Sequence, residues 1–222
     1  MLLALDTSTA QVGLAVFDGD QVLGEILWRS RQHHTVELAP AIAELLRRSG
    51  LSMDEVRALG VAIGPGSFTS LRVGLSFVKG LALACDLPLI GIPTLDIYAT
   101  AQPASKLPLL TAIQAGRGRL AVGWYKSTKH GWQAQGTARV TASDSLIYEI
   151  RTPTLVCGEF TAEEQQRLAK DEVNVKLVSP AQSVRRPSIL AELAWVRWQK
   201  GEVDEGASLA PIYLHTTEAN VT

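Results

Sequence analysis

Cysteine, aromatic residues and net charge are all scarce in this chain of 222 residues. Its two cysteines, Cys85 and Cys157, are isolated in apolar surroundings, which argues against a disulfide framework or a CxxC metal site and suits a reducing compartment. The chain has 21 basic and 22 acidic residues. It therefore lacks the excess of basic residues that is typical of a protein that binds nucleic acid by itself. The adjacent pair Arg185-Arg186 is typical of a solvated loop. The N-terminus shows no signal-peptide pattern and no transmembrane run, and we expect a cytoplasmic protein without a membrane contact.

Motifs for catalysis and metal binding are scarce as well. His33 and His34 are adjacent, so their side chains point apart instead of chelating as i, i+4 pairs do, and the chain contains no HExxH. It contains no Gly-x-Ser-x-Gly elbow, and no motif places an activating histidine beside Cys157. His130 and His215 are isolated, which is typical of surface residues. We therefore predict no catalytic residue and no metal site.

The order of predicted elements repeats along the chain. Each half is predicted to hold three strands followed by alternating helices and strands, and the polar stretch 101–106 divides the halves. The predicted strands are 2–6, 12–17, 22–29, 59–63, 89–92, 109–114, 120–125, 132–140, 154–156 and 173–178; the predicted helices are 35–48, 68–85, 143–150, 161–170 and 188–200. This order predicts an α/β protein with a duplicated actin-like fold, of the ribonuclease H-like (ASKHA) type, in which each lobe has a mixed sheet flanked by helices. We place the N-terminal lobe at 1–103 and the C-terminal lobe at 104–222, with its last residues packing back on the first lobe.

The run Gly64-Pro65-Gly66-Ser67-Phe68-Thr69-Ser70-Leu71-Arg72 joins a predicted buried strand to a predicted helix. Its glycines permit backbone angles that other residues resist, and Pro65 restricts one dihedral, so the turn is sharp. Free N–H groups at the start of the helix attract anions, but a plain strand-to-helix corner explains the run equally well. Together with the end of the first strand, the candidate anion or nucleotide contacts are Asp6, Thr7, Ser8, Gly66, Ser67 and Thr69.

The predicted helix 68–85 is apolar on every face, and Arg72 and Lys79 are its only charged residues. Such a helix must be covered all round. One side can pack on the sheet, whereas the other needs another helix of this chain or a partner protein, and we favour a partner. Gly74 lies four residues from both Ser70 and Val78, on a stripe where small side chains would let another helix approach closely. A glycine within a helix costs about 0.5–1 kcal/mol relative to alanine, which favours a packing role for it.

Phosphoryl transfer by an actin-like ATPase requires an acid at the end of the first strand of each lobe, where it holds Mg²⁺. Asp6 stands at this position in the first half, without a glycine turn beside it, but the matching residue of the second half is Gln114. A neutral amide cannot act as an ionised Mg²⁺ ligand or a general base. The chain is therefore poorly equipped for this reaction, and a structural role for Asp6 is favoured. A free-standing actin-like ATPase or small-molecule kinase stays the alternative.

Several motifs in the first half are specific enough to indicate a family. Leu3-Ala4-Leu5-Asp6-Thr7-Ser8-Thr9, His34-Thr35-Val36-Glu37-Leu38-Ala39-Pro40 and the Gly64–Arg72 run resemble the TsaB family, also called YeaZ. The spacing from Lys79-Gly80-Leu81-Ala82 to Ile90-Gly91-Ile92-Pro93-Thr94-Leu95 continues the resemblance. In the second half it thins to 112–125, Cys157-Gly158 and 211–214.

The resemblance implies an actin-like, two-lobed protein that helps to form threonylcarbamoyladenosine (t6A) at position 37 of tRNAs reading codons that begin with A. In that family the protein is a non-catalytic partner of the transferase TsaD. The ATPase TsaE joins the pair, and TsaC or its relative Sua supplies threonylcarbamoyl-adenylate.

The resemblance also implies the interfaces. The contact with TsaD is a bundle of helices from both N-terminal lobes, the isolated protein pairs with itself, and tRNA is bound only through the complex. No cofactor is implied for this chain, but ATP or ADP could lie at the interface with TsaE, and residual ATPase activity is compatible with the assignment. The candidate interface residues are Thr35, Leu38, Ala39, Ile42, Ser70, Leu71, Gly74, Leu75, Val78, Leu81 and Ala82.

Two departures from the family pattern bear on function. Ser70 replaces the usual glycine, which makes the helix start less open or better capped. Gln114 with Gly116-Arg117-Gly118 replaces a commoner Asp-Ala-Arg pattern, which weakens the case for a nucleotide between the lobes. The stretch 71–113 also contains no histidine, whereas the paired metal histidines of TsaD would be expected on a helix of its first lobe. These features favour a scaffold over a catalyst. A peptidase is suggested only by historical names of the paralogues.

Overall fold

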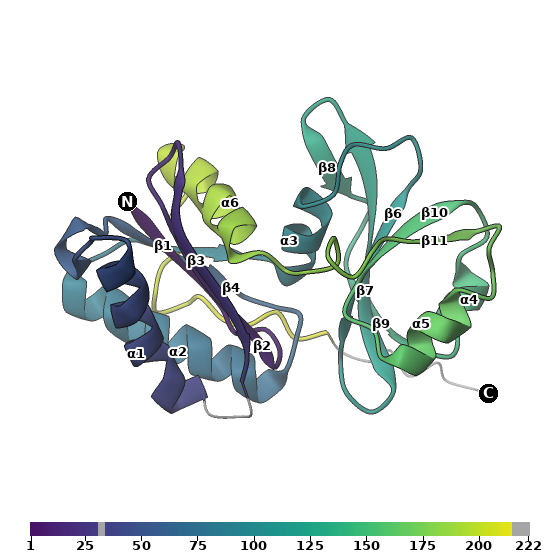
Figure 1. Cartoon of the computed structure of the whole chain (residues 1–222), viewed down its shortest axis with the longest axis horizontal. Helices are drawn as coiled ribbons and strands as arrows, with labels where there is room; N and C mark the ends of the chain where they lie inside the picture. Colours follow the sequence, from purple (N-terminus) through teal and green to yellow (C-terminus); the bar gives the residue numbers. More distant parts are fainter. Residues whose placement is uncertain (31–33, 215–222) are drawn as a thin grey trace. The chain divides into compact units, whose positions relative to one another are not determined.

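The computed structural model describes residues 1–30 and 34–214, and the chain forms two compact units. The first unit comprises residues 1–97 and 185–212, and the second is centred on residues 98–184 (Figure 1). This division differs from the predicted boundary between 103 and 104. Residues 185–212 belong to the first unit, whereas the prediction placed them in the second lobe with only its last residues packing back on the first. The reason is helix α6 (Pro187–Gln199), which packs against all five strands of the first unit's sheet and brings the flanking residues with it.

The first unit is built on a five-stranded mixed sheet of order β3-β2-β1-β4-β5. Neighbours β1, β2 and β3 are antiparallel, whereas β1, β4 and β5 run parallel. The strands are β1 (Leu2–Asp6), β2 (Gln11–Phe17), β3 (Val22–Arg29), β4 (Ala58–Ala62) and β5 (Leu89–Ile92). Strand β1 is buried along its whole length, because helices cover both faces of the sheet.

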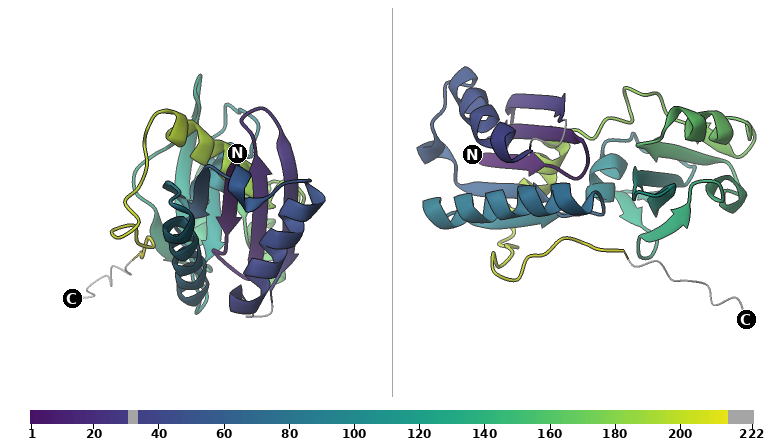
Figure 2. Two further views of the ribbon diagram at one scale, coloured as in Figure 1. Left: turned by 90° about the vertical axis from the view of Figure 1, so that its left-hand side faces the viewer. Right: turned by 90° about the horizontal axis from the view of Figure 1, so that it is seen from below.

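Helices α1 (His34–Arg48) and α2 (Phe68–Cys85) pack side by side on one face of this sheet, and α6 covers the other (Figures 1 and 2). Successive residues of β1 alternate between the two layers: Leu3 and Leu5 join the core under α1 and α2, whereas Leu2 and Ala4 join the core under α6. Full burial of a leucine side chain stabilises the fold by about 1.5–3 kcal/mol. The short helix η1 (Met53–Glu55) lies between α1 and β4, and α3 (Thr94–Thr100) follows β5.

The second unit contains a six-stranded mixed sheet of order β11-β10-β6-β7-β8, and β9 also pairs with β7. Strands β6, β10 and β11 are parallel, and β7 runs antiparallel to β6, β8 and β9. The strands are β6 (Leu109–Gln114), β7 (Arg119–Thr128), β8 (Gly131–Ala134), β9 (Arg139–Ala142), β10 (Thr154–Gly158) and β11 (Val175–Leu177); the helices are α4 (Leu146–Glu149) and α5 (Ala162–Leu168). Its core gathers Leu110, Leu120, Val122, Leu146 and Val156.

The observed elements follow the predicted order closely, so the mixed α/β architecture of both halves is confirmed. One predicted strand, 132–140, is instead two strands, β8 and β9. They are separated by a segment that includes Gly136, whose φ of +90° is incompatible with a continuous strand. Both strands still pair with β7, because β7 is long enough to hold one of them beside each of its ends.

Candidate functional site

Asp6 ends β1 and is 2 % exposed. Its carboxylate forms an ion pair with the guanidinium of Arg185, which is only 1 % exposed, and its Oδ1 accepts a hydrogen bond from the Ser8 amide at 2.8 Å. Arg185 Nη2 also donates to Thr9 Oγ1 at 3.1 Å and to the Gln11 carbonyl at 2.9 Å. The charge of Asp6 is thus neutralised inside the first unit, and the favoured structural role of this residue agrees with its geometry.

The prediction that Arg185 lies in a solvated loop is wrong. Arg185 precedes α6 and reaches back to the ends of β1 and β2, whereas its neighbour Arg186 is exposed and pairs with Glu25. No pattern in the sequence distinguishes the two arginines, because the partner of Arg185 lies 179 positions away. Removing one member of a buried ion pair typically costs about 3–5 kcal/mol, so this contact stabilises the junction between α6 and the sheet.

Hydrogen bonds connect the loop after β1 to the Gly64–Ser67 turn, both directly and through Thr94. Ser8 Oγ lies 2.8 Å from Thr94 Oγ1, and Thr94 Oγ1 in turn accepts from the Gly64 amide at 3.0 Å. The Ser67 amide donates to the Ser8 carbonyl at 2.7 Å. A Cβ on Gly66 would lie 2.2 Å from the Ser8 carbonyl oxygen, so only glycine allows this approach. No pattern in the sequence indicated that Thr94 would bridge Ser8 and Gly64.

These contacts bear on the two explanations of the turn. Thr7 and Ser8 are buried beside Asp6, and Thr7 Oγ1 donates to the Ser70 carbonyl at 2.9 Å. Of the other predicted anion contacts, Gly66 and Ser67 are half-buried and Thr69 is exposed. The Ser67 amide, which an anion at the helix start would use, already donates to Ser8. The geometry therefore favours a strand-to-helix corner over an anion cradle.

Most of the predicted interface residues lie on the face of α1 and α2 that packs against the sheet. Gly74 illustrates this, because a Cβ there would lie 1.9 Å from Thr7 Oγ1, inside the same unit. The residues that are buried in this way, contrary to a partner-facing position, are Leu38, Ile42, Ser70, Leu71, Gly74, Leu75 and Val78. Leu81 and Ala82 are half-buried against the same core, and Ala39 is exposed. The side chain of Thr35 lies outside the described residues.

The opposite side of these two helices is exposed and carries apolar and small residues together with the charged residues Arg47 and Arg72. We call its apolar and small part the outer helix face, which consists of Val36, Ala39, Ala43, Ser76, Gly80 and Leu83. Val36 is 66 % exposed and Leu83 is 87 % exposed. A Cβ added to Gly80 would meet nothing within 4 Å, so no contact within the unit accounts for a glycine at this position.

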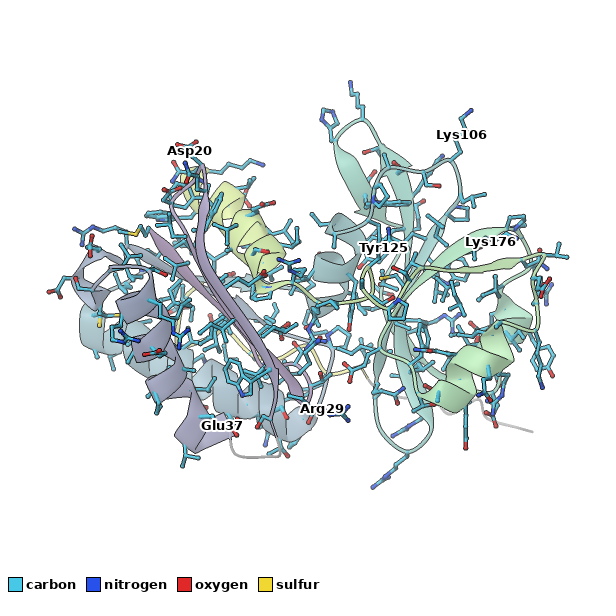
Figure 3. All side chains as sticks on the ribbon, in the orientation of Figure 1. Asp20, Arg29, Glu37, Lys106, Tyr125 and Lys176 are labelled. Carbon is cyan, nitrogen blue, oxygen red and sulfur yellow. The ribbon has the colours of Figure 1, made fainter. Side chains whose placement is uncertain are left out.

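An open groove between α1 and the edge strand β3 continues this surface. It is lined mainly by apolar side chains, including Ile26, Trp28, Val36 and Pro40. Glu37, labelled in Figure 3, accepts a hydrogen bond from Trp28 Nε1 at 3.0 Å across it. The apolar surface of the first unit therefore extends from α2 across α1 to the edge of the sheet.

Helix α2 is long and apolar enough to cross a membrane by length and composition alone. Five of its 18 residues are nevertheless buried against the sheet, and a core helix of an α/β protein produces the same signal.

In the second unit, the position equivalent to Asp6 is held by a neutral side chain. Gln114 Nε2 donates to Glu164 Oε2 at 2.7 Å and to the Glu159 carbonyl at 3.3 Å. Glu164 is buried and caps α5 by accepting from the Thr161 amide at 2.7 Å. A carboxylate in place of Gln114 would face this buried acid, so the amide fits where an ionised ligand would be repelled.

Cys157 is also unsuited to nucleophilic catalysis. Burial raises the pKa of its thiol to about 12, so it is not a thiolate at neutral pH. Among the described residues, no group of three or more His, Cys, Asp or Glu side chains is arranged to hold a metal ion.

Comparisons with known proteins find two related groups, the TsaB proteins and the threonylcarbamoyltransferases. Residues 21–186 match the family model TsaD, described as tRNA N6-adenosine threonylcarbamoyltransferase. The chain is 30 % identical to the tRNA threonylcarbamoyladenosine biosynthesis protein TsaB of Bacillus subtilis, over 98 % of this chain and 95 % of that protein. It is 32 % identical to TsaB of Escherichia coli over 67 % of this chain and 64 % of that protein.

A solved structure from Pseudomonas aeruginosa, described as an uncharacterized protein with similarity to peptidase YEAZ, superposes with a TM-score of 0.80. It is 23 % identical in sequence, with 96 % of this chain and 99 % of that one covered. At this identity the likeness concerns the fold, which is a duplicated actin-like α/β fold.

Proposed function

The chain belongs to the TsaB (YeaZ) family, and from this premise we propose that it is a non-catalytic subunit in the formation of t6A at position 37 of tRNAs that read codons beginning with A. It binds the transferase TsaD and, together with the ATPase TsaE, activates it in the cytoplasm. The exposed outer helix face is the observation that carries this proposal, because a subunit that acts through a partner needs a surface for that partner.

The residues that end β1 and β6 support a non-catalytic role. Mg²⁺ between two lobes requires ionised carboxylates with free oxygens. The Asp6 carboxylate is engaged with Arg185 in the first unit, and the Gln114 amide is engaged with Glu164 in the second. We therefore assign the ATP or ADP of the assembly to the interface with TsaE, and tRNA to the complex as a whole.

The outer helix face suits a bundle with two helices of TsaD. Helix axes approach to about 8–10 Å, depending on the side chains between them, so small residues permit the closest contact. Ser76, Gly80 and Ala43 are small and exposed, and Leu83 supplies an apolar anchor. In the absence of TsaD the same face pairs two copies of this chain, because a related surface is then the available apolar partner.

Gel filtration of the chain mixed with purified TsaD tests this interface. Gly80→Glu and Leu83→Glu place a charge on the outer helix face without a clash inside the unit, so both should fold normally and fail to co-elute with TsaD. Val196→Glu on α6 is the matched control, since Val196 is an exposed apolar residue, 51 % accessible, on the other side of the sheet. Co-elution of the Gly80 and Leu83 variants at the wild-type level would refute the assigned interface.

Reconstituted t6A formation tests the activity itself. TsaD and TsaE supplied with threonylcarbamoyl-adenylate and tRNA should form t6A only when this chain is added. Magnesium-dependent ATP turnover by the isolated chain would instead favour the ATPase or kinase alternative, particularly if Asp6→Asn abolished the turnover without unfolding the protein.

A further inference from the structure

The second unit has a long stretch that contains no acidic residue. Between Asp96 and Asp144 the sequence has 47 residues with six lysines and arginines, one histidine and no aspartate or glutamate. This stretch forms β6, β7, β8 and β9. The near-zero net charge of the chain therefore conceals an uneven distribution: residues 98–184 carry ten basic and seven acidic residues, whereas residues 1–97 and 185–212 carry 11 basic and 14 acidic ones.

Strand pairing brings several of these basic residues to one end of the sheet. Leu109 at the start of β6 pairs with Tyr125 near the end of β7, which places Lys106 beside the segment that follows Tyr125. That segment contains Lys126, Lys129 and His130 and turns into β8. Figure 3 shows Lys106 extending from its loop next to the β7–β8 hairpin. We call Lys106, Lys126, Lys129 and His130 the basic end of the sheet.

All four side chains of the basic end are exposed. Two other basic residues of the second unit are paired with acids inside it: Arg139 with Glu149 and Arg167 with Asp144. Among the described residues, no ion pair includes a lysine of the basic end. Asp171 and Glu172 precede β11, which is separated from β6 by β10.

We propose that the basic end binds the sugar-phosphate backbone of the tRNA while the tRNA is held by the complex. This inference rests on the proposed function, because it assigns the tRNA of that reaction as the polyanion. Phosphate contacts by lysine are independent of sequence and strengthen binding through counterion release. Three lysines are too few to hold RNA alone, which agrees with the net charge of −1, but they add to a contact that another subunit makes.

The test measures tRNA affinity of the complex of this chain with TsaD and TsaE, by fluorescence anisotropy across a salt series. The triple variant K106Q/K126Q/K129Q should weaken binding roughly tenfold at low salt and lower the slope of log K against log salt concentration by about two to three, as three lost phosphate contacts predict. The matched control is R57Q/K170Q/K200Q, which removes the same charge at exposed positions outside the basic end.

The outcomes separate this inference from the proposed function. Loss of affinity in the triple variant but not in the control, with co-elution with TsaD intact, supports the basic end as a tRNA contact. An unchanged affinity and slope, or an equal loss in the control, overturns it while the interface with TsaD still stands. Failure of the wild-type chain to join TsaD overturns the proposed function itself.

Discussion

The two sides of α2 carry similar residues, but the fold buries one side and leaves the other exposed. The inner side holds Gly74 and Val78 in buried positions, with Gly74 packed against Thr7. The outer side holds Gly80 and Leu83 in open surroundings. Close packing against Thr7 accounts for Gly74, whereas no contact within the unit accounts for Gly80, where we propose that a partner helix packs.

The largest expected effect contrasts a charge on the inner side with one on the outer side. Val78→Glu buries an unpaired carboxylate in the core and should lower the free energy of unfolding by more than about 4 kcal/mol. Leu83→Glu should change it by less than about 0.5 kcal/mol, because the side chain stays in solvent. Urea denaturation of both variants measures the difference. Equal stabilities would mean that the inner side is not buried.

Breaking the ion pair between Asp6 and Arg185 should have the next largest effect. Asp6→Ala leaves the Arg185 guanidinium buried without its carboxylate, and we expect a loss of about 3–5 kcal/mol in the free energy of unfolding. Asp20→Ala, at an exposed position in a turn, is the control and should change little. The double variant D6L/R185M should recover much of the loss, since it leaves no unpaired charge; no recovery would contradict the ion-pair explanation.

The two glycines of α2 should respond to alanine with opposite signs. Gly74→Ala places a Cβ against Thr7 Oγ1 and should destabilise the chain by about 1–3 kcal/mol. Gly80→Ala meets open space and should stabilise the isolated chain by about 0.5–1 kcal/mol through helix propensity. Thermal unfolding of the isolated chain checks both. The comparison fails if Gly80→Ala also destabilises.

The smallest effect concerns Glu44 on the outer surface of α1. Hydrogen bonds from Arg47 and Arg48 lower the pKa of this carboxylate from 4.5 to about 2. Because the folded pKa is depressed, the stabilising contribution is complete above pH 4.5 and is lost as the pH falls towards 2. NMR titration of Glu44 should show the low midpoint, and R47Q/R48Q should return it towards 4.5. An unshifted midpoint in the wild-type chain would show that these contacts do not persist in solution.

The order of strands and helices was predictable because local patterns carry it. Alternating or continuous apolar runs mark β1 and β2, and the glycines and proline before Ser67 mark the turn into α2. The direction in which α2 faces was not predictable, because a helix that is apolar on every side has no periodicity to orient it. For the same reason the predicted interface residues included Gly74 and Val78, which the sheet covers.

The amino-acid sequence by itself determined the two mixed sheets, the lack of a second strand-end acid at Gln114 and the family, since each rests on residues close together in the chain. Only the tertiary structure decided that Arg185 neutralises Asp6, that α6 joins the first unit and that lysines of two separate segments lie at one end of a sheet. Those features depend on contacts between residues far apart in the chain. Such contacts stabilise the fold without producing a local or periodic pattern in the sequence.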